Sequence, residues 1–160
     1  MQEPPPVKGL LIELEAFATA VAQLLADETI DWQWRPCAGE WSITEVVCHL
    51  RDVEREVHQT RFRDLVAAEN VFLPGVVADD WIQQRQYQLQ NGPAALKDFL
   101  AARCQTLVLL DDVPEEMWER RGQHAFFGPT SLHELLYLAV QHDTAHFDQL
   151  IALRHHAERA

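Results

Sequence analysis

Apolar residues recur at steps of three and four along the first half of the chain, which is the spacing of an amphipathic helix. One such stretch runs from Val7 to about Asp27, and a second runs from Ser42 to about Glu69. The inward positions are Leu10, Leu14, Phe17, Val21 and Leu24 in the first stretch, and Val46, His49/Leu50, Val53 and Val57 in the second. The pattern predicts one long helix in each.

The same period returns in the second half, from Ala94 to Leu110 and from Ser131 to about Arg154. The inward positions are Leu96, Phe99, Leu100, Cys104, Leu107 and Val108 in the third stretch, and Leu135, Leu138/Ala139, His142, His146, Leu150 and Leu153 in the fourth. Two more long helices are therefore expected.

Helix boundaries are marked by local signals. Ser42 with Glu45 has the spacing of a capping box, in which each residue binds the backbone N–H of the other, and this predicts the start of the second helix. Ser131 with Glu134 repeats that spacing before the fourth helix. Pro114 ends the third helix because proline cannot continue the hydrogen-bond pattern.

Four amphipathic helices without an alternating strand pattern predict an all-α fold, a four-helix bundle, as one domain over residues 1–160. The connections after the first and second helices are longer than a tight helical hairpin needs. We expect them to cross the bundle or to carry small extra helices. A short helix over 79–90, which includes Trp81 and Tyr87, is one candidate.

The composition limits the classes of molecule that the chain is expected to bind. The formal charge is −12, which disfavours nucleic acid because phosphate neutralisation supplies most of that affinity. No apolar stretch approaches the roughly 20 residues of a membrane span, so no membrane partner is expected. Three widely spaced cysteines, with no CxxC pair, are typical of a reduced compartment, and Glu13 and Glu15 disfavour a signal peptide. We expect a cytoplasmic protein with a small-molecule substrate.

The chain has eight histidines, and their positions around the predicted helices distinguish those that face the core from those that face solvent. At about 100° per residue, His49 falls on the inward stripe of the second helix, and both His142 and His146 fall on that of the fourth. His58 and His133 are expected to face away. The alternative for any one inward histidine is a core imidazole that hydrogen-bonds to a neighbour.

Three buried imidazoles in one bundle favour a shared cation, since each needs polar partners. The spacing of His142 and His146 aims both rings at one point. Three nitrogen ligands leave coordination positions open, as in catalytic metal sites, and they suit Zn(II), Ni(II), Fe(II) or Cu(II) without choosing among them. Asp52 and Gln149 lie within a turn of these ligands and are candidates to contact a ligand ring or a substrate.

Gly39-Glu40-Trp41-Ser42 at a helix start, His49, a central Trp81 and His142-x-x-x-His146-x-x-Gln149 follow one another in this order. In these motifs, from about Trp34 to Leu153, the chain resembles the DinB/YfiT-like superfamily. The resemblance implies an up-up-down-down four-helix bundle with long crossovers, and a homodimer. It also implies one divalent metal held by His49, His142 and His146.

Members of that superfamily include thiol-dependent S-transferases, which use a low-molecular-weight thiol as co-substrate, and metal-dependent hydrolases. The resemblance thus implies a metal-dependent transferase or hydrolase acting on a small molecule. Two alternatives remain open: a non-catalytic metal- or ligand-binding bundle that acts as a homodimeric interaction module, and a bundle that keeps the histidines only as core residues. No general base stands out from the sequence, and no role is assigned to Cys37.

Overall fold

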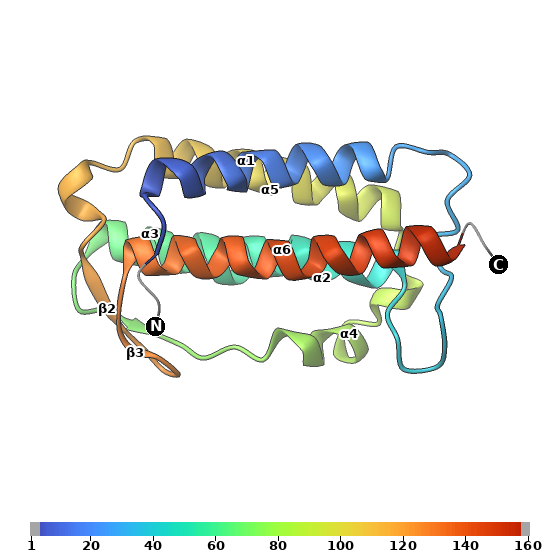
Figure 1. Cartoon of the computed structure of the whole chain (residues 1–160). Coiled ribbons are helices and arrows are strands. Elements are labelled where there is room, and N and C mark those ends of the chain that lie inside the picture. The colour runs from blue at the N-terminus through green and yellow to red at the C-terminus, as the bar shows by residue number, and fades with distance from the viewer. Residues whose placement is uncertain (1–3, 158–160) are drawn as a thin grey trace.

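Four long helices form the bundle in the computed structural model of the chain, which describes residues 4–157 (Figure 1). They are α1 (Val7–Leu24), α2 (Ile43–Val53) continued by α3 (Gln59–Ala67), α5 (Gly92–Asp111) and α6 (Leu132–Ala157). The all-α four-helix bundle expected from the sequence is confirmed. Among the described residues, no helix has both the length and the apolar character that a membrane span requires.

Helix α1 packs mainly on α6, and α2 packs mainly on α5. The two helices of each pair run parallel to one another. Helices α1 and α6 run in one direction, and α2, α3 and α5 run in the other (Figure 1). Passing around the bundle through α1, α6, α2 and α5, the directions are up, up, down and down. Since α3 and α5 point the same way, the chain must return along the bundle between them, which requires a long crossover.

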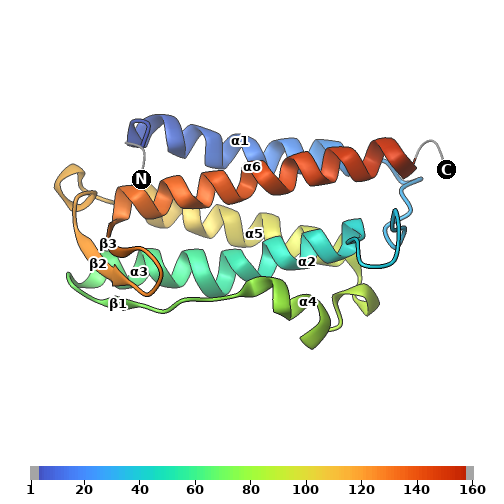
Figure 2. The same cartoon turned by 60° about the horizontal axis from the view of Figure 1, so that its bottom comes forward.

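That crossover, residues 68–91, runs beside α2 and α3 (Figure 2). It contains β1 (Phe72–Leu73) and α4 (Trp81–Gln84), with 3-10 turns at Ala78–Asp80 and Tyr87–Leu89. The expected short helix over 79–90 is therefore reduced to one α-helical turn between two tighter turns. Gln86 has a left-handed backbone with φ of 51°, which interrupts the helix.

A small sheet lies at one end of the bundle and was not expected from the sequence. Strand β1 pairs in parallel with β2 (Arg121–His124), which pairs antiparallel with β3 (Gly128–Ser131). Strands of two and four residues are too short to show a readable alternation. The sheet ties the crossover to the segment that leads into α6 (Figure 2).

The second helix changes its phase in the middle. A π-helical turn, Glu54–His58, separates α2 from α3 and inserts about one extra residue into the helix. In a regular helix the nine positions from His49 to His58 would place the two rings about 180° apart, and the insertion reduces this to about 80°. The expectation that His58 faces away was wrong, because His58 is buried.

Both capping boxes are present. The Ser42 hydroxyl accepts the Glu45 N–H, while the Glu45 carboxylate accepts the Ser42 N–H at 2.7 Å. Ser131 and Glu134 make the same pair of bonds at the start of α6.

Helix α5 departs from the expected phase. Cys104 is exposed and Val108 is 68% exposed, whereas Arg103 is 1% exposed and faces the core. The apolar periodicity predicted that Cys104 would face the core at this point of α5. It could not predict a buried Arg103, because a hydrophobic pattern counts every arginine as solvent-facing.

Candidate metal site

Three histidines meet between α2 and α6. One ring nitrogen from each of His49, His142 and His146 lies within 4.8 Å of the others. The Nε2 atoms of His49 and His142 are 3.1 Å apart. These three residues, called the histidine cluster below, lie close enough to hold one metal ion, as their helical phases predicted.

The separation of the His49 and His142 nitrogens fits a divalent ion, and the His146 nitrogen lies within 4.8 Å of both. Nitrogen ligands about 2.0–2.1 Å from a metal lie roughly 2.8–3.4 Å from one another when the angle at the metal is between octahedral and tetrahedral. The observed 3.1 Å falls in this range. A hydrogen bond between two imidazoles has a similar length, but it would involve only His49 and His142 and leave His146 out of the contact. The Nδ1 of His142 has no hydrogen-bond partner among the described residues, whereas hydrogen bonding by the backbone of Ala78 contributes to the pKa of His49.

The cluster is held in the neutral form that metal binding requires. Burial, with the charge of His146, lowers the pKa of His49 to about 3. Burial, with the charges of His58 and His146, places the pKa of His142 well below its ordinary value. Burial also lowers the pKa of His146, so the ring nitrogens keep free lone pairs at neutral pH.

Gln149 contacts a ring of the cluster, as the sequence suggested. The Nδ1 of His146 lies 2.9 Å from Oε1 of Gln149, one turn further along α6. When Nδ1–H donates to this amide oxygen, the proton is fixed there and Nε2 is left unprotonated. Gln149 thus orients the His146 ring and sets its tautomer.

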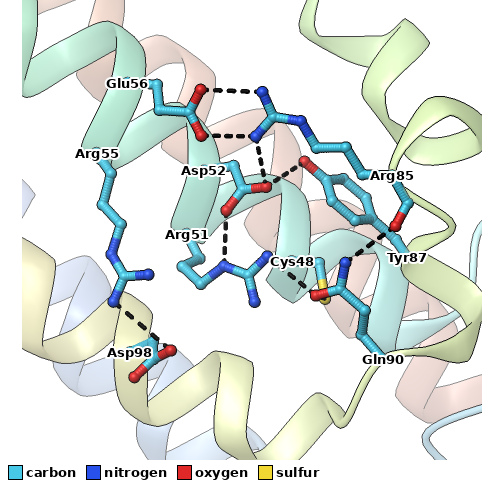
Figure 3. A network of polar contacts seen from close by, with 9 residues as sticks. All are labelled: Cys48, Arg51, Asp52, Arg55, Glu56, Arg85, Tyr87, Gln90 and Asp98. Atoms are coloured by element: carbon cyan, nitrogen blue, oxygen red, sulfur yellow. Dashed lines mark hydrogen bonds and ion pairs between the residues drawn. The ribbon is translucent and has the colours of Figure 1, made fainter.

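Asp52 is placed differently from Gln149. Its carboxylate accepts hydrogen bonds from Arg51, Arg85 and Tyr87, and it makes none with the histidine cluster (Figure 3). Arg85 also pairs with Glu56, which fastens the crossover to the α2 side of the bundle. Asp52 therefore holds the crossover in place rather than orienting a ring of the histidine cluster.

Trp41 covers one side of the cluster. Its ring stacks on His146 with centroids 5.9 Å apart and is tilted against His49 at 5.2 Å. Trp41 directly precedes Ser42, the N-cap of α2, so the capping box fixes the indole beside the imidazoles. The indole therefore covers the imidazoles on this side.

A cavity of about 250 Å³ borders the cluster on another side. All three histidines line it, together with apolar residues of α2, α6 and the π-helical turn, such as Val53, Val57 and Leu138. Its remaining polar wall is formed by His58, Arg61 and Asp79. A small molecule in this cavity would lie against the candidate metal ligands.

His58 and Arg61 are functional candidates that sequence reasoning missed. The His58 ring lies 5.4 Å from that of His142, and its Nε2 is buried without a hydrogen-bond partner in the described part of the chain. Burial lowers the pKa of His58 to about 4, so it is neutral. The only signal in the sequence is the histidine itself, because the π-helical turn that brings it inward has no recognised sequence signature.

The comparisons with known proteins agree with this architecture. The YfiT structure from Bacillus subtilis, described as "a probable metal-dependent hydrolase with an unusual four-helix bundle topology", matches with a TM-score of 0.83 and 18% identity. The match covers 98% of this chain and 91% of that one. The protein YuaE of Bacillus subtilis (strain 168), which is uncharacterized, is 24% identical over 147 residues, 85% of this chain and 90% of YuaE. The model of the DinB superfamily matches residues 10–150, a range that contains all three histidines, and the chain therefore belongs to the DinB superfamily.

Proposed function

We propose that the chain is a metal-dependent enzyme that hydrolyses a small molecule or transfers a group to it, with His49, His142 and His146 as the metal ligands. One observation carries the proposal: three neutral ring nitrogens converge at the wall of a cavity of about 250 Å³. The description of YfiT as a metal-dependent hydrolase supports the same class of chemistry.

Catalysis is favoured over a purely structural metal by the number of ligands. Structural zinc sites have four protein ligands, whereas catalytic sites have three and keep one position open. Within residues 4–157, the group that could hold an ion consists of three histidines, and a cavity lies beside it. A substrate would therefore have access to the metal.

The residues around the cluster have separate tasks. A divalent ion would supply Lewis-acid chemistry, which lets water or a thiol act as an anionic nucleophile near neutral pH. Gln149 keeps the His146 ring in the required tautomer, and Trp41 shields the imidazoles from solvent. Val53, Val57 and Leu138 offer an apolar surface to the body of the substrate, and His58 offers it a hydrogen-bonding nitrogen.

The metal content of untagged protein tests the site. We expect about one divalent ion per chain in the wild type, and a large loss in His49→Ala and in His146→Ala. His156→Ala, at an exposed position in the last turn of α6, is the matched control and should keep its metal. An unchanged metal content in both cluster variants would refute the site.

The cobalt-substituted protein separates the reaction classes. A thiol-dependent transferase should give a sulfur-to-cobalt charge-transfer band when 2-mercaptoethanol is added, while a hydrolase should cleave p-nitrophenyl acetate only when metal is present. A spectrum that responds to neither thiol nor azide would mean a closed coordination shell, and would favour the non-catalytic binding module. The expected homodimer stays a prediction, which sedimentation velocity would test.

A further inference from the structure

Arg61 is a charged residue in the cavity wall that the proposed metal chemistry does not use. It lies in α3, three residues after His58, and its side chain is partly buried. One guanidinium nitrogen, Nη2, donates to the backbone carbonyl of Pro74 at 2.9 Å. Its other N–H groups make no hydrogen bond to the described residues, and no carboxylate in that part of the chain forms an ion pair with it.

Other arginines at comparable depth are paired. Arg51 pairs with Asp52, Arg85 pairs with Asp52 and Glu56, and Arg103 pairs with two buried carboxylates. The chain has 25 acidic residues, so a missing partner at Arg61 does not reflect a shortage of carboxylates. Burial lowers the pKa of Arg61, as expected for a charge that is partly removed from water and has one backbone carbonyl beside it.

Positive and negative side chains lie on different sides of the cavity. The charge of Arg61 lowers the pKa of both His58 and His124, whereas Asp79 raises that of His146. Arg61 therefore adds positive charge on the side of His58, where Glu54 acts more strongly in the opposite sense from behind the ring, and Asp79 adds negative charge on the side of His146. An anionic group entering the cavity would be drawn to the Arg61 side, next to the unpartnered Nε2 of His58.

We propose that the substrate is a small carboxylic acid with an apolar body, and that Arg61 binds its carboxylate while the reacting bond lies at the histidine cluster. This inference rests on the proposed function, because it assigns the substrate class of the same site. The guanidinium presents a planar set of donors that matches a carboxylate. A cavity of about 250 Å³, below the roughly 300–1,000 Å³ of pockets for drug-sized ligands, restricts the body to a small one.

A matched pair of probes tests the subsite without any assay of activity. Phenylacetate and phenylacetamide share one apolar body and differ in the charged group. Their dissociation constants would be measured by calorimetry for the wild type, Arg61→Met and Arg63→Met, each with metal and after treatment with chelator. Arg63, exposed and two residues away on α3, is the matched control, since its removal takes away one positive charge outside the cavity.

We expect the wild type to bind the acid about tenfold more tightly than the amide. The preference should fall to about one in Arg61→Met, persist in Arg63→Met, and survive the chelator. Arg61→Lys keeps the charge and should retain part of the preference, which guards against a loss caused only by the broken bond to Pro74. Melting temperatures would confirm that each variant is folded.

An equal affinity for acid and amide in the wild type would overturn the proposal. So would a preference that survives in Arg61→Met but disappears with the chelator, because the carboxylate would then bind the metal. If the protein holds no metal and still prefers the acid through Arg61, the proposed function fails and the anion subsite stands. If metal is bound without such a preference, the enzyme proposal stands and the subsite fails.

Discussion

Two polar clusters in the bundle each take a residue from the same turn of α6, and they differ in how completely their atoms are paired. His142 belongs to the histidine cluster, and the next residue, Asp143, belongs to a cluster of Arg103, Glu54 and Asp143, called the Arg103 cluster. Arg103 donates two hydrogen bonds to each carboxylate, at 2.7–3.0 Å, and one to a backbone carbonyl of α1. The histidine cluster, in contrast, leaves the buried Nδ1 of His142 without a hydrogen-bond partner among the described residues and borders a cavity.

The contrast distinguishes a structural cluster from a binding site. Each charged group of the Arg103 cluster has partners inside the protein, with two carboxylates sharing one guanidinium, and each side chain is at most 4% exposed. Burial outweighs the charge of Arg103 at Asp143 and raises the pKa of that carboxyl to about 6. Burial alone would raise the pKa of Glu54, but the charge and hydrogen bonds of Arg103 hold that pKa below its ordinary value. Polar groups that remain unsatisfied beside a cavity are instead available to a ligand.

The largest effect should come from breaking the Arg103 cluster. Arg103→Met leaves two carboxylates buried without their cation, which typically costs about 3–5 kcal/mol of the free energy of unfolding. Urea unfolding at neutral pH measures it. Arg63→Met, at an exposed site, should stay within about 0.5 kcal/mol of the wild type. A loss below about 1 kcal/mol in Arg103→Met would show that the carboxylates find other partners, and would remove the distinction between the clusters.

The stability contributed by the histidine cluster should depend on whether a metal ion is bound. Removing metal with a chelator should lower the melting temperature of the wild type, because an ion that binds only the folded state at about 100 times its dissociation constant contributes roughly 2.7 kcal/mol. The double variant His49→Ala/His146→Ala should show no such shift. A wild type that melts at the same temperature with and without chelator would make the cluster a packed core feature.

The two clusters also show what the sequence could and could not predict. His49, His142 and His146 were found because helical phase is a local property and each sits in a regular stretch of helix. The capping box at Ser42 was equally local. Neither prediction depended on knowing how the helices pack.

The sequence did not predict the positions of Arg103, His58 and Arg61, and the physical reason differs for each. A hydrophobic pattern assigns arginine to solvent, so a buried arginine compensated by residues from two other helices cannot be read from it. His58 depended on the π-helical turn, which shifts the phase of everything after Val53. Arg61 follows that turn, and its place in the cavity also requires the crossover to fold back against α3.

A smaller effect should separate orientation of a ligand from ligation. Gln149→Leu removes the acceptor for the His146 ring, and losing such a partner typically weakens metal affinity about 10–100-fold. Competition with a chromophoric chelator measures the affinity. Asp148→Asn changes an exposed neighbour and should leave it unaltered. Equal affinities in wild type and Gln149→Leu would mean that the ring is held by packing against Trp41 alone.

The smallest effect concerns the contacts of Asp52, which Figure 3 shows. Like the Arg103 cluster they are satisfied, but the arginines that make them are partly exposed. Burial opposes ionisation of Asp52, but hydrogen bonds from Arg51, Tyr87 and Arg85 outweigh it and lower its pKa. A lowered folded-state pKa means that the ionised carboxylate stabilises the fold above the ordinary value of 3.8, and that this contribution is lost as the pH falls through the folded-state pKa.

Tyr87→Phe removes one of these donors and should cost about 1 kcal/mol at pH 7. The difference from wild type should shrink as the pH is lowered below about 4, because protonation of Asp52 removes the charge that the hydroxyl stabilises. Urea unfolding across this range measures the change. Metal content should not change, since Asp52 makes no hydrogen bond with the imidazoles. A variant that loses metal along with stability would mean that the crossover, rather than helical phase alone, holds the histidine cluster together.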